Sequence, residues 1–350
     1  MLRILSYVQL LFLISQFIIY INKGIVNEFV IISFVLLLIV LLFQIKIFRS
    51  ELKEFSKRSR KEKYLNSFLL LFLLLIGFQL NSLGNIEKAG TLASLQEVPN
   101  IGLIFKVGGT IIPVMAFSFF FSRISMKKKI GIFLLSFLIS AYTSITILSK
   151  QPLIPYFIFL LFMVQQKLIS RKYFILLFFL FIPPVIFVYF LRGSADNIQD
   201  VIVLMIFRIT MLAETSHIML WIQEHNALGY IPLSEYPAVI TRDVFDYDPR
   251  YIGIAPSFLG FFIVIFGQFG IIIPFIFIKG TSVLIKLINT STLEGRLIYF
   301  FWVVELLSFF TDGIPHFYLS TSNGKLFWIL VILTIIKIAS TQRMIKQKAH

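Results

Sequence analysis

The side chains best suited to chemistry are four arginines within the polar stretch 192–255, which interrupts a largely apolar chain. They are Arg192, Arg208, Arg242 and Arg250. A guanidinium group stays charged, and its planar fork binds phosphate oxygens through two parallel hydrogen bonds. The set therefore predicts a binding site for a phosphorylated ligand. Pairing with nearby acids or with lipid headgroups is the simpler alternative.

Two histidines are candidates for a general base. His217 follows Glu214 by three residues, so on a helix the carboxylate would lie one turn away and could orient the imidazole. His316, in the short polar sequence DGIPH, is a competing candidate. The alternative for His217 is a histidine at a membrane interface without a catalytic role.

The residues that usually hold metals are not arranged for it. Asp246 and Asp248 form a DxD pair, but such a pair is common by chance and is typical of a turn before Pro249. The chain has no cysteine, and no cluster of His, Cys and Asp shows the spacing of metal ligands. We therefore expect neither a catalytic metal nor a cofactor.

The composition indicates a membrane protein. Of the 350 residues, 58% are hydrophobic and 14% are charged, and the mean hydropathy is +0.91. Soluble domains carry about 25% charged residues. Apolar runs of about 17–25 residues, the length that spans a bilayer as a helix, recur from end to end. The predicted fold class is an all-α polytopic membrane protein with about ten transmembrane helices.

The distribution of basic residues predicts how the chain is oriented. The ten apolar ranges are 4–22, 28–47, 64–83, 102–122, 130–148, 153–166, 173–191, 256–278, 297–311 and 325–339. When alternate connections are placed on alternate sides, 23 of the 32 Lys and Arg residues fall on the side of the N-terminus. Basic loops stay in the cytoplasm, so both termini are predicted to be cytoplasmic. The net charge of +15 then reflects topology, and no nucleic-acid partner is expected.

We expect one integral membrane domain, residues 1–350, with two prominent connections. Residues 46–63 form a basic cytoplasmic loop, and residues 192–255 form a large external loop. Within that loop, residues 200–222 are expected to form an amphipathic or partly re-entrant helix on the outer face. At helical spacing, one face of this helix carries Thr210, Glu214, His217, Trp221 and Glu224.

Two features inside the apolar ranges need an explanation. Pro183 and Pro184 are expected to break or kink the seventh range, because proline lacks the backbone N–H of a helix. Glu305 lies in the ninth range, and an acid within the membrane is by default a functional residue. The alternative is that Glu305 pairs with Lys106 in the fourth range.

Residues 207–217, FRITMLAETSH, resemble the entry to the large loop of bacterial oligosaccharide repeat-unit polymerases, the O-antigen and capsule polymerase (Wzy-type) family. Gly229 near the loop centre and Arg242 after an apolar turn follow in the family's order. The run 255–274 is similar to the family's next span, with a late Phe-Gly-x-x-Gly at Phe266, Gly267 and Gly270. The family often has Pro before the second Arg and a Trp-Pro-x-Lys-Pro run after it, and this chain has neither.

The resemblance implies a GT-C-like glycosyltransferase in the bacterial cytoplasmic (inner) membrane. Such an enzyme joins undecaprenyl-pyrophosphate-linked oligosaccharides into O-antigen or capsular polysaccharide. Arg208 and Arg242 would stabilise the pyrophosphate leaving group, with Arg192 and Arg250 as further candidates. The implied partners are the lipid-linked oligosaccharides, membrane lipids, and a chain-length regulator and a flippase of the same pathway.

Three other functions stay open on the sequence alone. A flippase or transporter for lipid-linked oligosaccharides would also have many spans and basic cavity residues, although it would more often show internal repeats. A glycan ligase is chemically close to a polymerase. A membrane O-acyltransferase would need a histidine accessible from the cytoplasm, and no internal cytoplasmic loop contains one.

Overall fold

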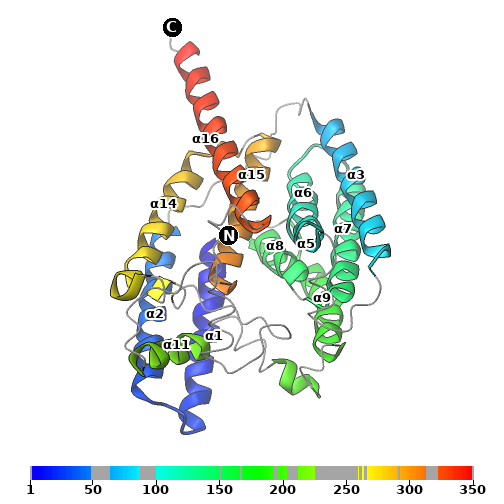
Figure 1. Ribbon diagram of the computed structural model, residues 1–350. Helices are drawn as coiled ribbons and strands as arrows, with labels where there is room; N and C mark the ends of the chain where they lie inside the picture. Colours follow the sequence, from blue (N-terminus) through cyan, green and yellow to red (C-terminus); the bar gives the residue numbers. More distant parts are fainter. Residues whose placement is uncertain are drawn as a thin grey trace. The chain divides into compact units, whose positions relative to one another are not determined.

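The computed structural model is mostly helical and contains no strand in the part of the chain that it describes (Figure 1). That part comprises residues 2–48, 64–86, 100–149, 151–165, 168–191, 196–202, 212–224, 259, 262–263, 266–290, 292–312 and 322–348. Its α-helices are α1 (Leu2–Asn22), α2 (Glu28–Phe48), α3 (Leu65–Gly84), α5 (Ile101–Lys106), α6 (Ile112–Phe119), α7 (Met126–Thr146), α8 (Ile154–Gln165), α9 (Arg171–Leu191), α11 (Leu212–Glu224), α14 (Ile273–Leu287), α15 (Leu293–Asp312) and α16 (Ser322–Lys348). A π-helical turn, η1 (Val107–Ile111), joins α5 to α6, and two 3₁₀ turns are η2 (Gln151–Leu153) and η4 (Gly267–Ile271).

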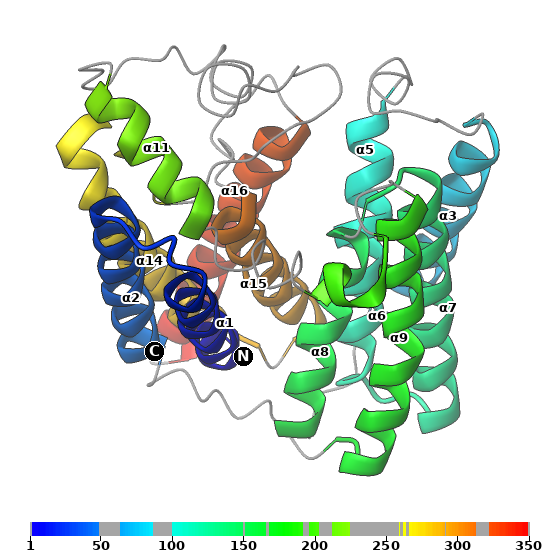
Figure 2. The same cartoon turned by 90° about the horizontal axis from the view of Figure 1, so that it is seen from below.

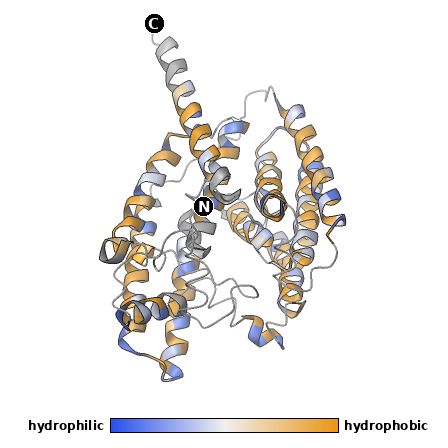
Figure 3. Ribbon diagram, viewed as in Figure 1, coloured by the Kyte–Doolittle hydropathy of each residue, from blue (hydrophilic) through white to orange (hydrophobic). Residues whose placement is uncertain are grey.

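Apolar residues cover most of these helices, as Figure 3 shows. Six described segments are long and apolar enough to cross a membrane: Glu28–Ile47, Leu65–Gly84, Ile101–Phe119, Met126–Thr146, Lys172–Leu191 and Phe269–Leu287. Three shorter apolar helices are Ser6–Asn22, Ile154–Val164 and Phe327–Ser340. Each of the ten predicted ranges overlaps a helix, which supports an all-helical membrane protein. That the chain crosses the membrane ten times stays a prediction.

The chain divides into two compact units, each built from segments that are distant in sequence. Unit 1 comprises Met1–Leu52, Asn197–Val283 and Leu306–Pro315. Unit 2 comprises Lys53–Asp196, Leu284–Glu305 and His316–His350. The prediction of a single integral domain does not distinguish these two units, and it stays a prediction.

Unit 1 is organised by the antiparallel hairpin of α1 and α2. Gly24, with φ of +67°, occupies the left-handed conformation in the connecting turn, and Asn27 Oδ1 caps α2 by accepting the Val30 N–H at 2.9 Å. The rings of Phe17 and Phe34 stack at 4.0 Å between the two helices. Apolar side chains of the hairpin share a buried cluster with those of the later segments: Leu13, Val30, Leu37, Leu41, Leu212, Leu259 and Ile263.

Helix α11 lies across α2 in unit 1 (Figure 1; Figure 2 gives the view from below). The Ser33 hydroxyl donates to the sulfur of Met219 at 3.2 Å, which fixes the crossing close to the start of α2. Ser33 is five residues from the first residue of α2, or about 8 Å along its axis. Helix α11 therefore packs near the end of the hairpin that carries the turn.

Unit 2 has an aromatic centre. The ring of Phe117 stacks on Phe159 at 4.1 Å and meets the edge of Phe300 at 4.6 Å. Phe162 packs against the same cluster, and all four side chains are buried. Offset and edge-to-face ring contacts add about 0.5–1.5 kcal/mol each to the burial of the rings. This centre joins α6, α8 and α15.

Two helices differ from their predicted form. Helix α14 begins at Ile273, whereas the sequence predicted a span over 256–278 with a basic connection after it. Lys279 and Lys286 are helical and exposed, and because they are seven residues apart they share one face. Helix α9 continues through Pro183 and Pro184, so the helix does not break there, and a kink at these residues stays a prediction. In a membrane helix, neighbouring groups can satisfy the carbonyls that a proline leaves without a partner.

Candidate functional site

Most of the predicted site residues lie outside the described part of the chain. These are Arg192, Arg208, Arg242, Arg250 and His316, and their roles stay predictions. The same applies to most of the basic loop 46–63 and to the irregular segment 229–250.

Helix α11 carries the two remaining candidates. Glu214 and His217 are both helical, as predicted, and the imidazole of His217 is exposed. Glu224 is exposed and Trp221 half-buried on the same face, whereas Ile218 is fully buried. The structure therefore confirms that this face of the helix carries His217, Trp221 and Glu224. The imidazole does not fill the core, and its catalytic role stays a prediction.

Unit 2 contains a buried ion pair between α5 and α15. Lys106 Nζ lies 3.2 Å from Glu305 Oε1, and the two side chains are only 2% and 5% exposed. This confirms the alternative that Glu305 pairs with Lys106. Removing two charges from water is costly, and their attraction offsets this only when the geometry is good. Ionisable groups within membrane helices mark functional sites more often than surface charges do.

A cluster of neutral hydrogen-bonding groups lies on another face of α5. Gln79 Nε2, from α3, donates to Ile104 O at 3.0 Å and to Thr143 Oγ1 at 3.0 Å. The Thr143 hydroxyl in turn donates to Ile139 O within α7. The side chains of Gln79 and Thr143 are fully buried. The amide of Gln79 thus ties α3 to α5 and α7.

The cluster continues from α7 to α8. The Ser140 hydroxyl donates to Gly108 O at 2.6 Å, and its oxygen lies 3.0 Å from the Tyr156 hydroxyl. Gly108 belongs to the π-helical turn, which holds one more residue per turn than an α-helix. Its carbonyl is thereby bonded by a side chain of another helix.

Glycine is required where the π-helical turn approaches its neighbours. A Cβ on Gly108 would lie 2.5 Å from Thr143 Oγ1 and 2.6 Å from Gln79 Nε2. A Cβ on Gly109 would lie 3.2 Å from Pro152 Cα. The absence of both side chains lets α7 and η2 pack against the turn. π-helical turns occur frequently at functional sites.

All these polar groups gather at one end of unit 2, which we call the polar end. There α3 and α7 finish and α5 and α8 begin. We call the following set the polar layer: Gln79, Lys106, Ser140, Thr143, Tyr156 and Glu305. The layer contains a cation, an anion and neutral donors and acceptors.

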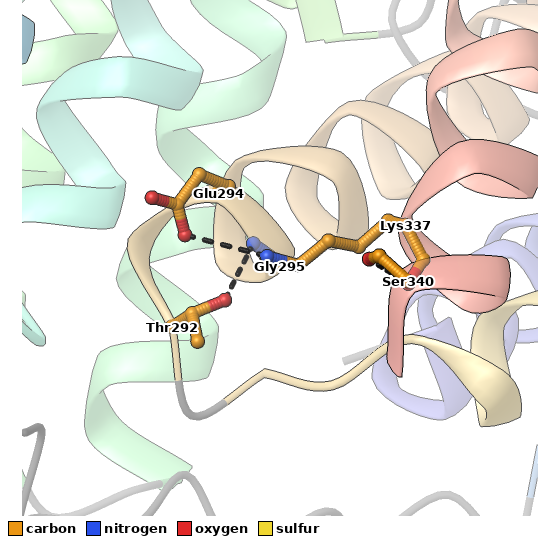
Figure 4. Close-up of polar contacts among 5 residues, drawn as sticks. All are labelled: Thr292, Glu294, Gly295, Lys337 and Ser340. Carbon is orange, nitrogen blue, oxygen red and sulfur yellow. Dashed lines mark hydrogen bonds and ion pairs between the residues drawn. The ribbon is translucent and has the colours of Figure 1, made fainter. Parts of the chain in front are cut away.

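The opposite end, where α7 and α15 begin, has a different polar pattern (Figure 4). Thr292 Oγ1 accepts the Gly295 N–H at 3.2 Å, and Glu294 Oε2 pairs with Lys337 Nζ of α16 at 3.5 Å. Glu294 and Lys337 are 36% and 22% exposed. Arg296, which is buried, donates to the Ser122 hydroxyl at 3.3 Å. These contacts cap helices and join them, and we call this end the basic end.

The polar layer can bind oxygen-rich groups, whereas the described residues offer little for a metal. Lys106 supplies a buried ammonium, and Gln79 Oε1 is a buried acceptor that accepts no hydrogen bond from the described residues. Among the described residues, no group of three or more His, Cys, Asp and Glu side chains could hold a metal ion.

Sequence reasoning singled out Lys106 and Glu305 but not the neutral members of the layer. A signal for some of them exists in α7, where Ser136, Ser140, Thr143 and Ser144 recur at spacings of three and four. Small polar residues at this spacing are typical of helix contacts within membranes. The partners Gln79 and Tyr156 come from other helices, and no spacing in α7 points to them.

Comparisons with known proteins do not assign this chain to a family. No family model, no curated protein and no solved structure matches it.

Proposed function

We propose that the protein is a glycosyltransferase that polymerises undecaprenyl-pyrophosphate-linked oligosaccharide repeat units at the outer face of the bacterial cytoplasmic membrane. Arg208 and Arg242 bind the pyrophosphate, with Arg192 and Arg250 as further contacts. His217 or His316 positions the acceptor hydroxyl or removes its proton.

The observation that carries this proposal is the placement of α11. This helix follows Arg208, exposes His217, and crosses α2 next to Ser33, near the turn of the α1–α2 hairpin. The charge distribution puts the N-terminus in the cytoplasm and hence this turn outside. A helix lying there agrees with the amphipathic helix that the sequence predicts on the outer face.

The chemistry of the transfer agrees with the proposed residues. The acceptor oxygen forms a bond to the anomeric carbon of the donor, and the bond from that carbon to the phosphate oxygen breaks. The pyrophosphate lipid leaves with the electron pair, and arginines stabilise its charge. The proton of the acceptor hydroxyl passes to the histidine.

The direct test is polymerisation by the purified protein. With undecaprenyl-pyrophosphate-linked repeat units as the only substrate, we expect longer glycans without added metal or nucleotide. Arg208→Ala and Arg242→Ala should each lower the rate of chain growth by about 100-fold or more, because each removes a donor to the leaving group. Gel separation of the glycans measures both results.

A matched control is Arg343→Ala, in the C-terminal part of α16, which should retain the full rate. If the Arg208→Ala and Arg242→Ala variants both make glycans of full length, the proposal that these arginines bind the pyrophosphate is contradicted. Transfer of a single glycan without chain growth would instead favour a ligase. Movement of the lipid-linked glycan across a vesicle membrane without any transfer would favour a flippase.

A further inference from the structure

Two lysines of unit 1 lie next to a ring contact that joins α2 to α14. The rings of Phe43 in α2 and Phe275 in α14 meet edge to face, with their centroids 5.1 Å apart. Lys46 follows Phe43 by three residues, and Lys279 follows Phe275 by four. Residues at these spacings are neighbours on one face of a helix, so each lysine lies beside the ring that faces the other helix.

The two lysines also lie at nearly the same level along their helices. The helical rise places Lys46 about 4.5 Å beyond Phe43 and Lys279 about 6 Å beyond Phe275. Both helices run towards the cytoplasm by the charge distribution, and in Figure 1 the later residues of each lie towards the same end of unit 1. Both lysines therefore lie on the cytoplasmic side of the ring contact, and their levels differ by about 2 Å.

No described side chain neutralises these two lysines. Both side chains are exposed, and neither forms an ion pair with any residue in the described ranges. Helix α14 contains no acid, and the one acid of α2, Glu28, lies about 27 Å from Lys46 along the helix axis. The two ammonium groups can therefore bind an anion from outside the chain.

The surface that leads to each lysine is apolar. Exposed side chains recur there at spacings of three and four residues and form one stripe on each helix. The stripes consist of Val35, Ile39, Leu42 and then Lys46 on α2, and of Ile272, Ile276 and then Lys279 on the apolar segment that contains α14. The apolar members are between 44% and 65% exposed. In a membrane, such a surface lies against the acyl chains of lipids.

The level of the two lysines marks the edge of the membrane. The apolar span in α2 ends at Ile47, one residue after Lys46, and spans of this length end where the hydrocarbon core ends. Because Lys279 lies at nearly the same level as Lys46, this edge crosses α14 at Lys279, and the helix continues past it to Leu287. A lysine side chain at this position extends its ammonium group to the lipid headgroups.

The chemistry of this surface selects a lipid with a negative headgroup. A phosphate group accepts hydrogen bonds from two ammonium groups at once. A zwitterionic headgroup adds a cation that the lysines repel, and an acidic soluble peptide would leave the apolar stripes uncovered. Anionic lipids of the cytoplasmic leaflet attract basic residues at the membrane surface.

We propose that Lys46 and Lys279 together bind the phosphate of one anionic phospholipid of the cytoplasmic leaflet, and that its acyl chains lie along the exposed stripes of α2 and α14. Lys286 shares the exposed face of α14 but lies about 10 Å beyond Lys279, past the end of α2 at Phe48, so it is not part of this site. The bound lipid holds the two helices together at the membrane surface. The lipid site is independent of the proposed transfer reaction.

Counting bound lipids by native mass spectrometry tests this site. The full-length protein, in a non-ionic detergent, is titrated with phosphatidylglycerol. Lys46→Gln and Lys279→Gln should each weaken binding of the tightest lipid by about tenfold, the ratio that one charge-assisted hydrogen bond supplies. The double variant should lose one tightly bound lipid and not two, because both lysines hold the same phosphate. Lys286→Gln, the matched control on the same face of α14, should change the affinity by less than about twofold.

Three results would overturn the proposal: unchanged affinity in Lys46→Gln or Lys279→Gln, the loss of two tightly bound lipids in the double variant, or an equal loss of affinity in Lys286→Gln. The last result would show a general attraction between basic residues and anionic lipid. If a glutamine variant does not fold, the wild type provides the test. Phosphatidylcholine should bind to it at least about tenfold more weakly than phosphatidylglycerol, and equal affinities would contradict a site for an anionic headgroup.

Discussion

Helix α15 carries two glutamates that pair with lysines in opposite surroundings. Glu305 meets Lys106 at 3.2 Å, with both side chains buried, whereas Glu294 meets Lys337 at 3.5 Å near the surface of unit 2. The two glutamates are eleven residues apart, so they lie about 16 Å from each other along the helix axis. The chemical groups are the same, and the difference between the pairs comes from burial.

Burial changes what each pair can do. A pair that solvent reaches contributes about 0–1 kcal/mol, and it can break and form again with little consequence. A pair without solvent has no substitute partner in water, so either charge alone is strongly unfavourable. A substitution of either partner is therefore expected to destabilise the Lys106–Glu305 pair strongly, whereas the Glu294–Lys337 pair mainly joins α15 to α16.

The largest expected effect comes from removing one partner of the buried pair. Lys106→Met should lower the free energy of unfolding by about 3–5 kcal/mol, because it leaves the Glu305 carboxylate buried without its cation. Combining it with Glu305→Leu should recover most of this loss, since both charges are then absent. Unfolding by a denaturing detergent, followed by helical circular dichroism, measures the three variants. A double variant as unstable as Lys106→Met would show that packing rather than charge dominates here.

A smaller effect is expected from the glycine beside the pair. Gly108→Ala should lower the free energy of unfolding by about 1–3 kcal/mol, because its Cβ would collide with Thr143 Oγ1 and Gln79 Nε2. Adding Thr143→Ala should restore part of the loss by removing one of the colliding groups. The same detergent unfolding checks both variants.

Gly131, in α7, provides the matched control, because no described atom beyond its chain neighbours and its own helix backbone lies within 4 Å of the Cβ that alanine would add there. Gly131→Ala should be neutral or slightly stabilising, since alanine favours a helix more than glycine does. Equal losses for Gly108→Ala and Gly131→Ala would mean that close packing at the π-helical turn is not what requires glycine.

The helices could be predicted from hydrophobic runs, but their bounds could not always be. The run 256–278 contains three glycines, and α14 begins beyond the last of them, next to Pro274. Proline is favoured in the first turn of a helix, because its missing N–H would have no helical partner there. The two lysines that were expected to end the span instead share one exposed face, so they do not interrupt the apolar side of the helix.

The pairing of Lys106 with Glu305 could be predicted from the sequence, as the alternative to a functional role for Glu305. Charges are scarce in the apolar ranges, and a charge within a membrane needs a partner, so Lys106 and Glu305 were natural candidates for each other. The neutral groups were not predictable in this way. The contacts of Gln79 with Thr143 and of Ser140 with Tyr156 depend on which helices are neighbours and on the π-helical turn. No residue pattern specifies either of them.

The smallest expected effect is at the exposed pair of Glu294 and Lys337, which serves as the reference for the buried pair. Glu294→Gln and Lys337→Gln should each change the free energy of unfolding by less than about 1 kcal/mol. Glu294→Gln should have the larger effect of the two, because Glu294 also lies in the first turn of α15, where a negative charge interacts favourably with the helix dipole.

A double-mutant cycle separates these two contributions. The coupling energy between Glu294 and Lys337 does not include the interaction of Glu294 with the helix dipole, because that interaction persists when Lys337 is changed. We expect this coupling to decrease as salt is added, because exposed charges are screened, and the coupling between Lys106 and Glu305 to be insensitive to salt. Detergent unfolding at low and high ionic strength measures both couplings. A surface coupling as large and as independent of salt as the buried one would mean that burial is not what separates the two pairs.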